Sequence, residues 1–270
     1  MEQDDTVFAG SIPLLYEECL VPLVFEPYAV DLARRVHERN PRRVLELAAG
    51  TGVVTRAMAE MLPVDTRIVA TDLNPAMLEQ ARIIGALRPV EWRQADAMAL
   101  PFADGGFDAV VCQFGAMFFP DKARAFAEAR RVLKPGGTFL FNVWDRIDEN
   151  EFADAVGDAL GQVFPDDPPR FMARTPHGYH DVAAIARDLA EAGFASAPRI
   201  ETIAFRCRAE SPRVVAIAYC QGTPWRNEIE ARDASRLEAA TDAAEAEIAR
   251  RFGHGTVSGR MQAHVVEIAA

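Results

Sequence analysis

Cysteine is scarce and scattered in this chain of 270 residues. It contains four cysteines, Cys19, Cys112, Cys207 and Cys220, and no two of them form a CxxC pair. Disulfide scaffolds and structural zinc sites need cysteines at close or paired spacings, so we expect neither of them. Dispersed single cysteines suit a reducing compartment, and we therefore predict a cytoplasmic protein.

Positive charge and long apolar runs are also lacking. Lys and Arg number 29 against 40 Asp and Glu, a formal net charge of −11, whereas phosphate binding needs a basic footprint. The longest apolar stretch, around residues 109–119, is too short to span a bilayer. The acidic start, MEQDDTVFAG, has no apolar centre typical of a secretory signal. We expect a small-molecule partner, with no nucleic acid and no membrane, while the oligomeric state is not readable.

Hydrophobic residues make up half of the chain, which is enough for a sizeable core. Between residues 42 and 145 short apolar runs alternate with helical patterns. Strands are predicted at 42–48, 67–72, 90–96, 107–115 and 138–144, and helices at 53–62, 74–85 and 122–133. Repeated strand–helix units with nearly continuous apolar strands predict a parallel sheet that is covered by helices on both faces.

The flanking regions are less regular. Pro22 and Pro27 are expected to break the segment 11–36 into short helical pieces. Residues 145–180 contain a proline-rich patch and are interpreted as an irregular insertion. Further helices are predicted at 181–194, 211–222 and 226–253, and further strands at 199–209 and 260–269.

We predict one domain over residues 1–270. Its parts are an N-terminal lid segment (1–40), a cofactor-binding core (41–145), two insertions that shape the substrate side (145–180 and 209–255), and remaining sheet elements (181–208 and 256–270).

The stretch VLELAAGTGVV, residues 44–54, joins the first strand to a helix through a loop of small residues. Ligands of parallel sheets bind at the carboxyl ends of strands, where glycines allow close approach and a helix amino end offers free N–H groups. Dinucleotides and S-adenosylmethionine both use this geometry. The third glycine of a dinucleotide fingerprint is replaced by Thr55. Glu46 would repel a pyrophosphate but suits an ammonium or sulfonium group, so S-adenosylmethionine is favoured.

Two aspartates follow the next two strands. Asp72 can accept both hydroxyls of a ribose; the alternative is a helix cap, but Asn74 already suits that role. Asp96 can accept from the exocyclic amine of adenine, with the Ala97 N–H facing a ring nitrogen; the alternative is a turn-forming aspartate. The joint occurrence of Glu46, Asp72 and Asp96, each about one strand–helix unit apart, favours a bound cofactor.

Four segments resemble the class I S-adenosylmethionine-dependent methyltransferases: LELAAGTG, ATDLNPAMLEQAR, QADAMALPFADGGFDAVVCQFGAMFF and EARRVLKPGGTFLF. They look closest to the branch of quinone-biosynthesis and other small-molecule methyltransferases. The resemblance implies an α/β, Rossmann-like, seven-stranded and mostly parallel sheet with helices on both faces. Its last strand, 260–269, would be antiparallel, and N-terminal lid helices and a partly helical insertion would complete the fold.

The resemblance also implies S-adenosyl-L-methionine as the cofactor. It places Glu46, Ala48, Gly50 and Gly52 around the methionine part, Asp72 and Leu73 at the ribose, Asp96 and Ala97 at the adenine, and Gln113 near the sulfonium. Thr51 and Met77 complete the set of expected cofactor contacts.

Methyl transfer from a sulfonium is an in-line displacement in which the protein mainly aligns the acceptor, and a base is needed only for a protonated nucleophile. The segment RTPHGYHD offers His177, Tyr179 and His180 as candidate bases. The alternative is that both histidines are surface residues beside Asp181, which would cap the following helix. No further ligand cluster accompanies His177 and His180, so no metal site is expected.

Aromatic and apolar residues are candidates for the substrate pocket. Phe114, Met117 and Phe118 form an apolar wall or pack in the core, and Tyr16, Phe25 and Tyr28 form a lid or pack against the sheet edge. Tyr179 belongs to the same candidate pocket. The expected activity is methyl transfer to O, N or C of a small, apolar or aromatic acceptor. A non-catalytic S-adenosylmethionine-binding module is the alternative, and an NAD-dependent reductase is a poorer one.

Overall fold

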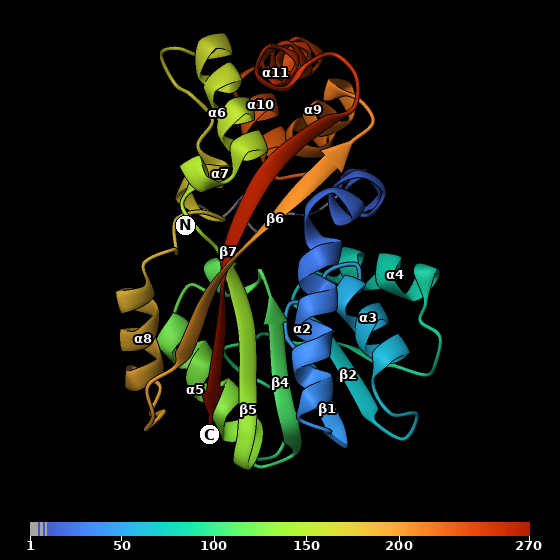
Figure 1. Ribbon diagram of the computed structural model, residues 1–270, viewed down its shortest axis with the longest axis vertical. Coiled ribbons are helices and arrows are strands. Elements are labelled where there is room, and N and C mark those ends of the chain that lie inside the picture. The colour runs from blue at the N-terminus through green and yellow to red at the C-terminus, as the bar shows by residue number, and fades with distance from the viewer. Residues whose placement is uncertain (1–4, 6–7, 9) are drawn as a thin grey trace. The chain divides into compact units, whose positions relative to one another are not determined.

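A computed structural model describes residues 5, 8 and 10–270 of the chain (Figure 1). Seven strands form one sheet in the order β3-β2-β1-β4-β5-β7-β6. The strands are β1 (Arg43–Glu46), β2 (Arg67–Asp72), β3 (Glu91–Gln94), β4 (Phe107–Gln113), β5 (Leu133–Trp144), β6 (Arg199–Ala209) and β7 (Val257–Ala269). The strand order reverses between β1 and β4, which is where parallel sheets bind their ligands.

The five strands β3, β2, β1, β4 and β5 are parallel. β7 runs against β5, because the Gly136 N–H donates to the Ala270 carbonyl while the Asp145 N–H donates to that of Gln262. Figure 1 shows β6 and β7 with opposite directions. The expected seven-stranded, mostly parallel sheet with a reversed last strand is therefore confirmed.

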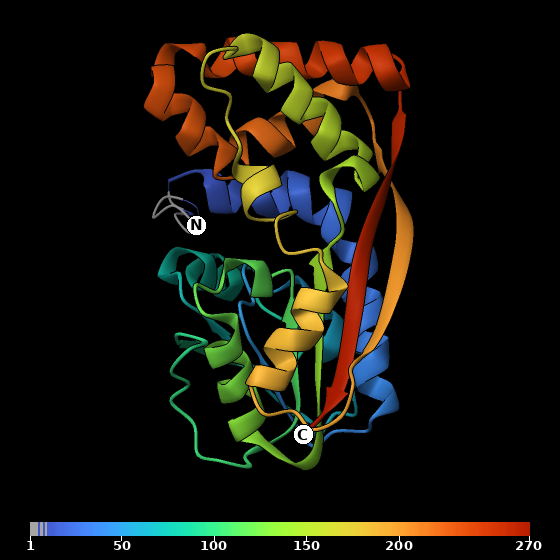
Figure 2. The same cartoon turned by 90° about the vertical axis from the view of Figure 1, so that its left-hand side faces the viewer.

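Helices lie between most consecutive strands. They are α1 (Ile12–Leu15), the π-helix η2 (Tyr16–Phe25), α2 (Glu26–Glu38), α3 (Val53–Met61), α4 (Pro75–Ile84), α5 (Lys122–Val132), α6 (Glu151–Val163), α7 (Phe171–Arg174), α8 (Val182–Glu191), α9 (Pro212–Gln221), α10 (Trp225–Asp233) and α11 (Leu237–Phe252). Single 3₁₀ turns span Ala116–Phe118, Ile147–Glu149 and Ala234–Arg236. Within the parallel part, α2 and α3 cover one face of the sheet and α5 and α8 the other (Figure 2).

Two helix starts confirm the predicted caps. The Asn74 side chain accepts from the Ala76 N–H at 2.9 Å, and Pro75 occupies the first helical position of α4. The Asp181 side chain accepts from the Ala183 N–H, also at 2.9 Å, at the start of α8. Side-chain oxygens at these positions satisfy N–H groups that have no partner within the helix, so both boundaries are encoded locally.

Pro22 does not break the N-terminal segment, contrary to expectation. Helical structure continues from Ile12 to Glu38, with Pro22 inside η2 and Pro27 at the second residue of α2. A proline is tolerated in the first turn of a helix, where its missing N–H has no intrahelical partner. The π-helix, whose hydrogen bonds span five residues, absorbs the other proline.

The region 145–180 is not an irregular insertion, because it contains α6 and α7. Phe152, Val156 and Leu160 recur every four residues in α6, and all three are buried. This spacing gives one apolar helix face. The expected helix 226–253 is divided into α10 and α11 by the 3₁₀ turn Ala234–Arg236. Strand β5 begins at Leu133, five residues before the strand expected at 138–144.

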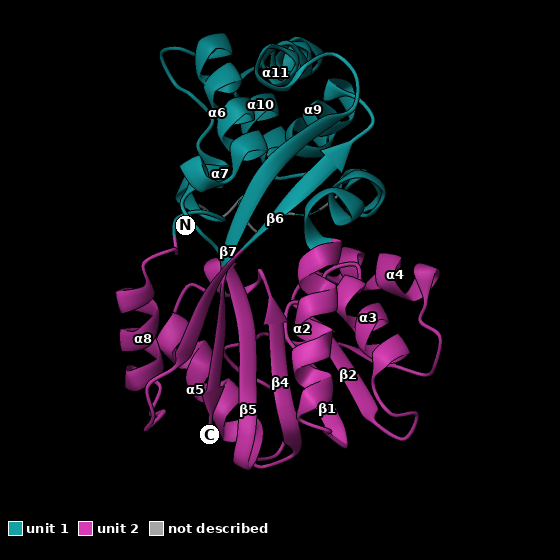
Figure 3. Cartoon of the chain, in the orientation of Figure 1, with its two compact units in different colours: residues 1–25, 144–178, 204–263 teal, residues 26–143, 179–203, 264–270 magenta. Residues whose placement is uncertain are grey.

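The chain divides into two compact units (Figure 3). Unit 1 comprises residues 1–25, 144–178 and 204–263, and unit 2 comprises 26–143, 179–203 and 264–270. Strands β6 and β7 contribute residues to both units. Both expected insertions belong mainly to unit 1 and the expected cofactor core mainly to unit 2. That residues 1–270 form a single domain stays a prediction.

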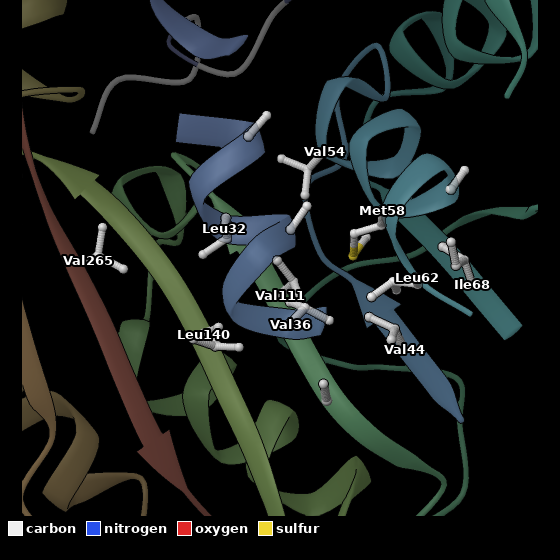
Figure 4. Close-up of a cluster of buried hydrophobic side chains, with 14 residues drawn as sticks. Leu32, Val36, Val44, Val54, Met58, Leu62, Ile68, Val111, Leu140 and Val265 are labelled. Carbon is white, nitrogen blue, oxygen red and sulfur yellow. The ribbon is translucent and has the colours of Figure 1, made fainter. Parts of the chain in front are cut away.

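A buried cluster in unit 2 joins α2 and α3 to the sheet (Figure 4). It includes Leu32 of α2, Val54 and Met58 of α3, Val44 of β1 and Val111 of β4. Because β1 and α3 both belong to this cluster, the loop between them is anchored at both ends. Within the described part of the chain, no helix combines the length and the apolarity that a membrane span requires.

Candidate functional site

The loop between β1 and α3 holds three residues in the left-handed conformation. The φ angles are +51° at Ala48, +57° at Gly50 and +88° at Gly52. The Ala49 N–H donates to the Thr71 carbonyl of β2 at 2.9 Å. The loop therefore turns sharply at the carboxyl ends of β1 and β2, as expected for a ligand loop.

Gly52 is required by a contact within the protein. A Cβ at this position would lie 2.7 Å from a ring carbon of Trp92, a residue of β3. We expected the loop glycines to allow close approach of a ligand, whereas at Gly52 the close neighbour is Trp92. Nothing in the local sequence signals this contact, because it forms only when β3 aligns beside β2.

Glu46 is buried, with 1% of its surface exposed. Its carboxylate accepts from the Thr55 hydroxyl at 2.5 Å. Burial raises the pKa of Glu46 to about 8, Asp72 acts in the same direction, and the Thr55 hydrogen bond and Arg56 oppose the increase. Thr55, which replaces the third glycine of a dinucleotide loop, is thus the direct partner of Glu46. A cationic ligand would stabilise the ionised form of this carboxyl group.

Asp72 holds the same loop from the next strand. One carboxylate oxygen accepts from the Gly50 N–H at 2.8 Å, and the other accepts from the Asn74 N–H at 2.7 Å. Burial raises the pKa of Asp72, and these backbone hydrogen bonds oppose the increase. Each carboxylate oxygen has a second acceptor site, so Asp72 can still receive ribose hydroxyls. Leu73, 56% exposed, follows it directly.

Asp96 closes a turn after β3. Its carboxylate accepts from the Met98 N–H at 2.8 Å, which is the turn-forming role considered as its alternative. Asp96 and Ala97 are both half-buried, and an aspartate in this geometry retains further acceptor sites. Met77, also expected at the cofactor, is buried in α4.

The end of β4 forms a second tight turn. Gln113 is buried and pairs with Asn142 of β5. Phe114 has φ +50°, and its N–H donates to the Asn142 carbonyl at 3.1 Å and to the Asn142 side-chain oxygen at 2.9 Å. The Phe114 ring packs edge-on against Tyr28, at 5.2 Å between centroids. Asn142 was not among the residues expected at the site, because no motif surrounds it in the sequence.

Two buried polar atoms near these turns have no hydrogen-bond partner within the described part of the chain. They are the Thr51 hydroxyl oxygen and the side-chain nitrogen of Asn142. A buried polar group without a partner typically costs about 1–3 kcal/mol, and a polar ligand at the loop would offer partners. Together with Glu46 and Asp72, the Thr51 hydroxyl fits the ammonium, carboxylate and hydroxyl groups of S-adenosylmethionine.

Other pocket candidates take structural roles in unit 2. Tyr28 is fully buried, and its hydroxyl donates to the Ile203 carbonyl at 3.1 Å, so it packs in the core. Met117 is buried and Phe118 half-buried in the 3₁₀ turn after β4. The Lys122 ammonium binds the Phe119 carbonyl at 2.9 Å at the end of this turn.

Tyr179 is also held within unit 2. Its hydroxyl donates to the Asp188 carboxylate at 2.6 Å, and the Lys122 ammonium lies 4.7 Å from its ring centre. Burial and Asp188 both raise the pKa of Tyr179. Its proton is therefore retained at neutral pH, which does not suit a base.

Unit 1 has an aromatic hollow of its own. Phe25 stacks on Tyr16 at 5.0 Å between ring centroids and lies 6.0 Å from Trp144. The side chains that line the hollow are Leu20, Val24, Phe25, Trp144, Asn150, Met172, His177, Tyr219 and Met261. The hollow is mainly apolar, with a few polar groups among its walls.

His177 is buried in this hollow, contrary to the surface position considered as its alternative. Its Nδ1 lies 2.7 Å from the Asp145 carbonyl oxygen. A carbonyl only accepts, so Nδ1 carries the proton of the neutral ring and Nε2 is the basic nitrogen. The Asn150 side chain donates to the Arg146 carbonyl at 3.0 Å, next to Asp145, and so helps to fix the backbone that His177 contacts.

The two candidate histidines belong to different units, since His180 is a half-buried residue of unit 2. In the part of the chain that the structure describes, no three His, Cys, Asp or Glu side chains are grouped for a metal ion.

The geometry of unit 2 agrees with the comparisons with known proteins. Residues 45–141 match the family model described as a methyltransferase domain. Demethylmenaquinone methyltransferase of Thermus thermophilus is 46% identical over 114 residues, which are 42% of this chain and 50% of that protein. The chain thus matches about half the length of this curated relative, and the family match lies wholly within unit 2.

Solved structures share the fold over a longer part of the chain. The phosphoethanolamine N-methyltransferase 2 of Haemonchus contortus, solved with S-adenosylhomocysteine, has a TM-score of 0.61 at 15% identity. This match covers 98% of this chain and 59% of that one. The [4+2]-cyclase SpnF has a TM-score of 0.56 at 19% identity. This match covers 97% of this chain and 95% of SpnF. At these identities the likeness shows the fold alone.

Proposed function

We propose that this chain, whose residues 45–141 match the model of a methyltransferase domain, is a class I S-adenosylmethionine-dependent methyltransferase that methylates a small apolar or aromatic acceptor. The observation that carries the proposal is the set of carboxylates at one sheet edge. Glu46, Asp72 and Asp96 stand at or just beyond the carboxyl ends of β1, β2 and β3, which are adjacent and parallel. A cofactor with an ammonium group, a ribose and an adenine matches the three positions.

Three residues around the loop would hold different groups of the cofactor. Glu46 would face the ammonium, the Thr51 hydroxyl the carboxylate, and Asp72 the ribose hydroxyls. When bound, S-adenosylmethionine supplies a methyl group that is already activated by its sulfonium. The protein then has to align the acceptor and exclude water, and alignment alone can contribute about 7–11 kcal/mol to the rate.

The aromatic hollow of unit 1 is our candidate for acceptor recognition, and its walls must part to admit a ring, because it now has room for little more than a water molecule. Trp144 and Phe25 offer flat apolar faces, and His177 offers a basic Nε2 among them. This combination favours a ring that carries an ionisable hydroxyl or amine, whose proton His177 would take. The name of the Thermus relative suggests a hydroquinone-like ring as the first acceptor to try, although the family match over residues 45–141 does not include this hollow.

Calorimetry with S-adenosylmethionine tests the cofactor part of the proposal. We expect saturable binding by the folded protein, and no binding at millimolar cofactor would refute the proposal.

Incubation with methyl-labelled cofactor and host extract, followed by mass identification of labelled small molecules, tests the transfer. A parallel assay uses one defined acceptor, the reduced (hydroquinone) form of demethylmenaquinone, after the name of the Thermus relative. Labelled product identifies the acceptor and the methylated atom.

A non-catalytic S-adenosylmethionine-binding module is the second candidate. The SpnF neighbour, named as a cyclase, illustrates that this fold alone does not establish methyl transfer. Tight cofactor binding without label in any small molecule would favour this module. An NAD-dependent reductase is a poorer candidate, since Thr55 stands at the third glycine and Glu46 opposes a pyrophosphate; a titration of nicotinamide fluorescence tests it.

A further inference from the structure

We propose that Asn142 is a positioning residue of the methyl-transfer site, which fixes the turn after β4 and, through that turn, the cofactor loop after β1. The inference rests on the proposed function, because the loop is taken to hold the methyl donor. Asn142 is fully buried in β5 and is paired with Gln113 of β4.

The first link is the hydrogen bond from the Phe114 N–H to the Asn142 side-chain oxygen, at 2.9 Å. Phe114 has φ +50°, a conformation that a residue with a bulky side chain rarely adopts. Such a conformation persists only where the surroundings hold it. Asn142 supplies two acceptors to this single N–H, its own carbonyl at 3.1 Å and its side chain.

The second link is the contact between the turn and the cofactor loop. A Cβ on Gly115 would lie 2.4 Å from the Ala48 Cβ and 2.8 Å from the Cys112 sulfur. Gly115 therefore lies directly against Ala48, the first left-handed residue of the loop, with φ +51°. Any relaxation of Phe114 would move Gly115 against or away from Ala48, so the two turns keep their shapes together.

The third observation is the Asn142 side-chain nitrogen, which is buried and has no partner among the described residues. Burial of an unpaired donor is unfavourable, and a leucine of similar size would avoid it. An asparagine here is therefore poorly explained by stability. The hydrogen bond that its side-chain oxygen accepts from the Phe114 N–H explains an asparagine at this position by its effect on the site.

The test compares Asn142→Leu with Thr138→Val, a matched control on the same strand that pairs with Ala109. Hydrogen exchange is followed in peptides covering residues 113–118 and 47–52, and S-adenosylmethionine affinity is measured by calorimetry. We expect Asn142→Leu to speed exchange in both segments and to weaken affinity about tenfold, which corresponds to about 1.4 kcal/mol. Thr138→Val should change neither.

Loop exchange is the decisive readout, because a purely structural role of Asn142 would alter 113–118 alone. Unchanged exchange in 47–52 would overturn the proposal, whatever the effect on affinity. If Asn142→Leu does not fold, Asn142→Ser serves as the second variant and must show the same two changes. Failure of the unmodified protein to bind S-adenosylmethionine would reject the proposed function, whereas the exchange comparison would still decide the role of Asn142.

Discussion

Glu46 combines burial, a raised pKa and a hydroxyl partner in a way that links cofactor binding to pH. Its pKa of about 8 exceeds the ordinary value of 4.5, so between these values the folded state holds a proton that the unfolded state releases. The stability that this group contributes is complete below pH 4.5 and is lost as pH rises to about 8. A cationic ligand, in contrast, needs the ionised form.

Glu46→Gln should therefore separate stability from cofactor affinity. The amide cannot ionise, so the cofactor-free variant should lose less thermal stability than the unmodified protein between pH 6 and pH 8. Its affinity for S-adenosylmethionine should fall by about 1–3 kcal/mol, since the ammonium loses its anionic partner. Thermal melts at both pH values and calorimetry check this. An identical pH dependence of the two proteins would contradict the raised pKa.

Asp72 should affect the cofactor more than an ordinary structural aspartate does. Asp72→Ala removes the acceptors for the Gly50 and Asn74 N–H groups and for the ribose, and we expect affinity to fall by about 1–3 kcal/mol. Asp108→Ala is the matched control, because that carboxylate also accepts backbone N–H groups, from Arg42 and Arg43. Calorimetry at a temperature where each variant is folded measures both. Equal losses of affinity would mean that the ribose has been placed wrongly.

His177 and His180 give the most direct test of base catalysis. If the acceptor loses a proton, His177→Gln should slow turnover by about 10²–10⁴-fold and leave S-adenosylmethionine affinity unchanged. His180→Gln, three residues further on, should reduce turnover much less. Steady-state kinetics with the identified acceptor compare the two variants, and the reverse ranking would remove His177 from the mechanism.

The candidate cofactor residues were predictable from the sequence because their signals are local. Glu46, Asp72 and Asp96 each end or follow a short predicted strand, and a parallel sheet brings such strand ends together. Trp92 and Asn142 could not be predicted, because their roles depend on contacts between segments that are distant in sequence. His177 and His180 were read as one group, although a separation of three residues places them in different units.

Among the structural elements, the β1–α3 corner depends on two properties of Gly52 that can be separated. Gly52→Ala adds a steric clash with Trp92 to the strain of a positive φ. Gly136→Ala, at φ +77° with no atom within 4 Å of the added Cβ, carries the strain alone.

We expect Gly136→Ala to cost about 1 kcal/mol of unfolding free energy and Gly52→Ala clearly more, with loss of cofactor affinity only in the latter. Denaturant titration and calorimetry check these values. Equal destabilisation would show that the Trp92 contact relaxes without effect.

The elements themselves were predictable wherever their signals lie within one run of sequence. The caps of α4 and α8 and the alternation from β1 to β5 are of this kind. The π-helix around Pro22 was not, since a proline normally indicates a break and only the surrounding packing makes this helix continuous. The proline-rich patch that follows α6 obscured the fourfold spacing of Phe152, Val156 and Leu160.

At the scale of the whole molecule, β6 and β7 contribute residues to both compact units. Because these strands are continuous, we expect the two units to unfold in one cooperative transition. S-adenosylmethionine should shift that whole transition upward, by about 2.7 kcal/mol at a concentration one hundred times its dissociation constant. Differential scanning calorimetry with and without cofactor tests this. Two separate transitions, with only one moved by the cofactor, would show that the units are independent.

Unit 1 is assembled from three separate stretches of chain, residues 1–25, 144–178 and 204–263, and this constrains protein engineering. A single crossover between two related methyltransferases would transfer only part of that unit and would pair mismatched halves of its aromatic hollow. Recombination intended to exchange the acceptor preference that we propose for this hollow must carry all three stretches together. Unit 2 contains the loop proposed to hold the methyl donor, and its uninterrupted stretch 26–143 can instead be moved as a single cassette.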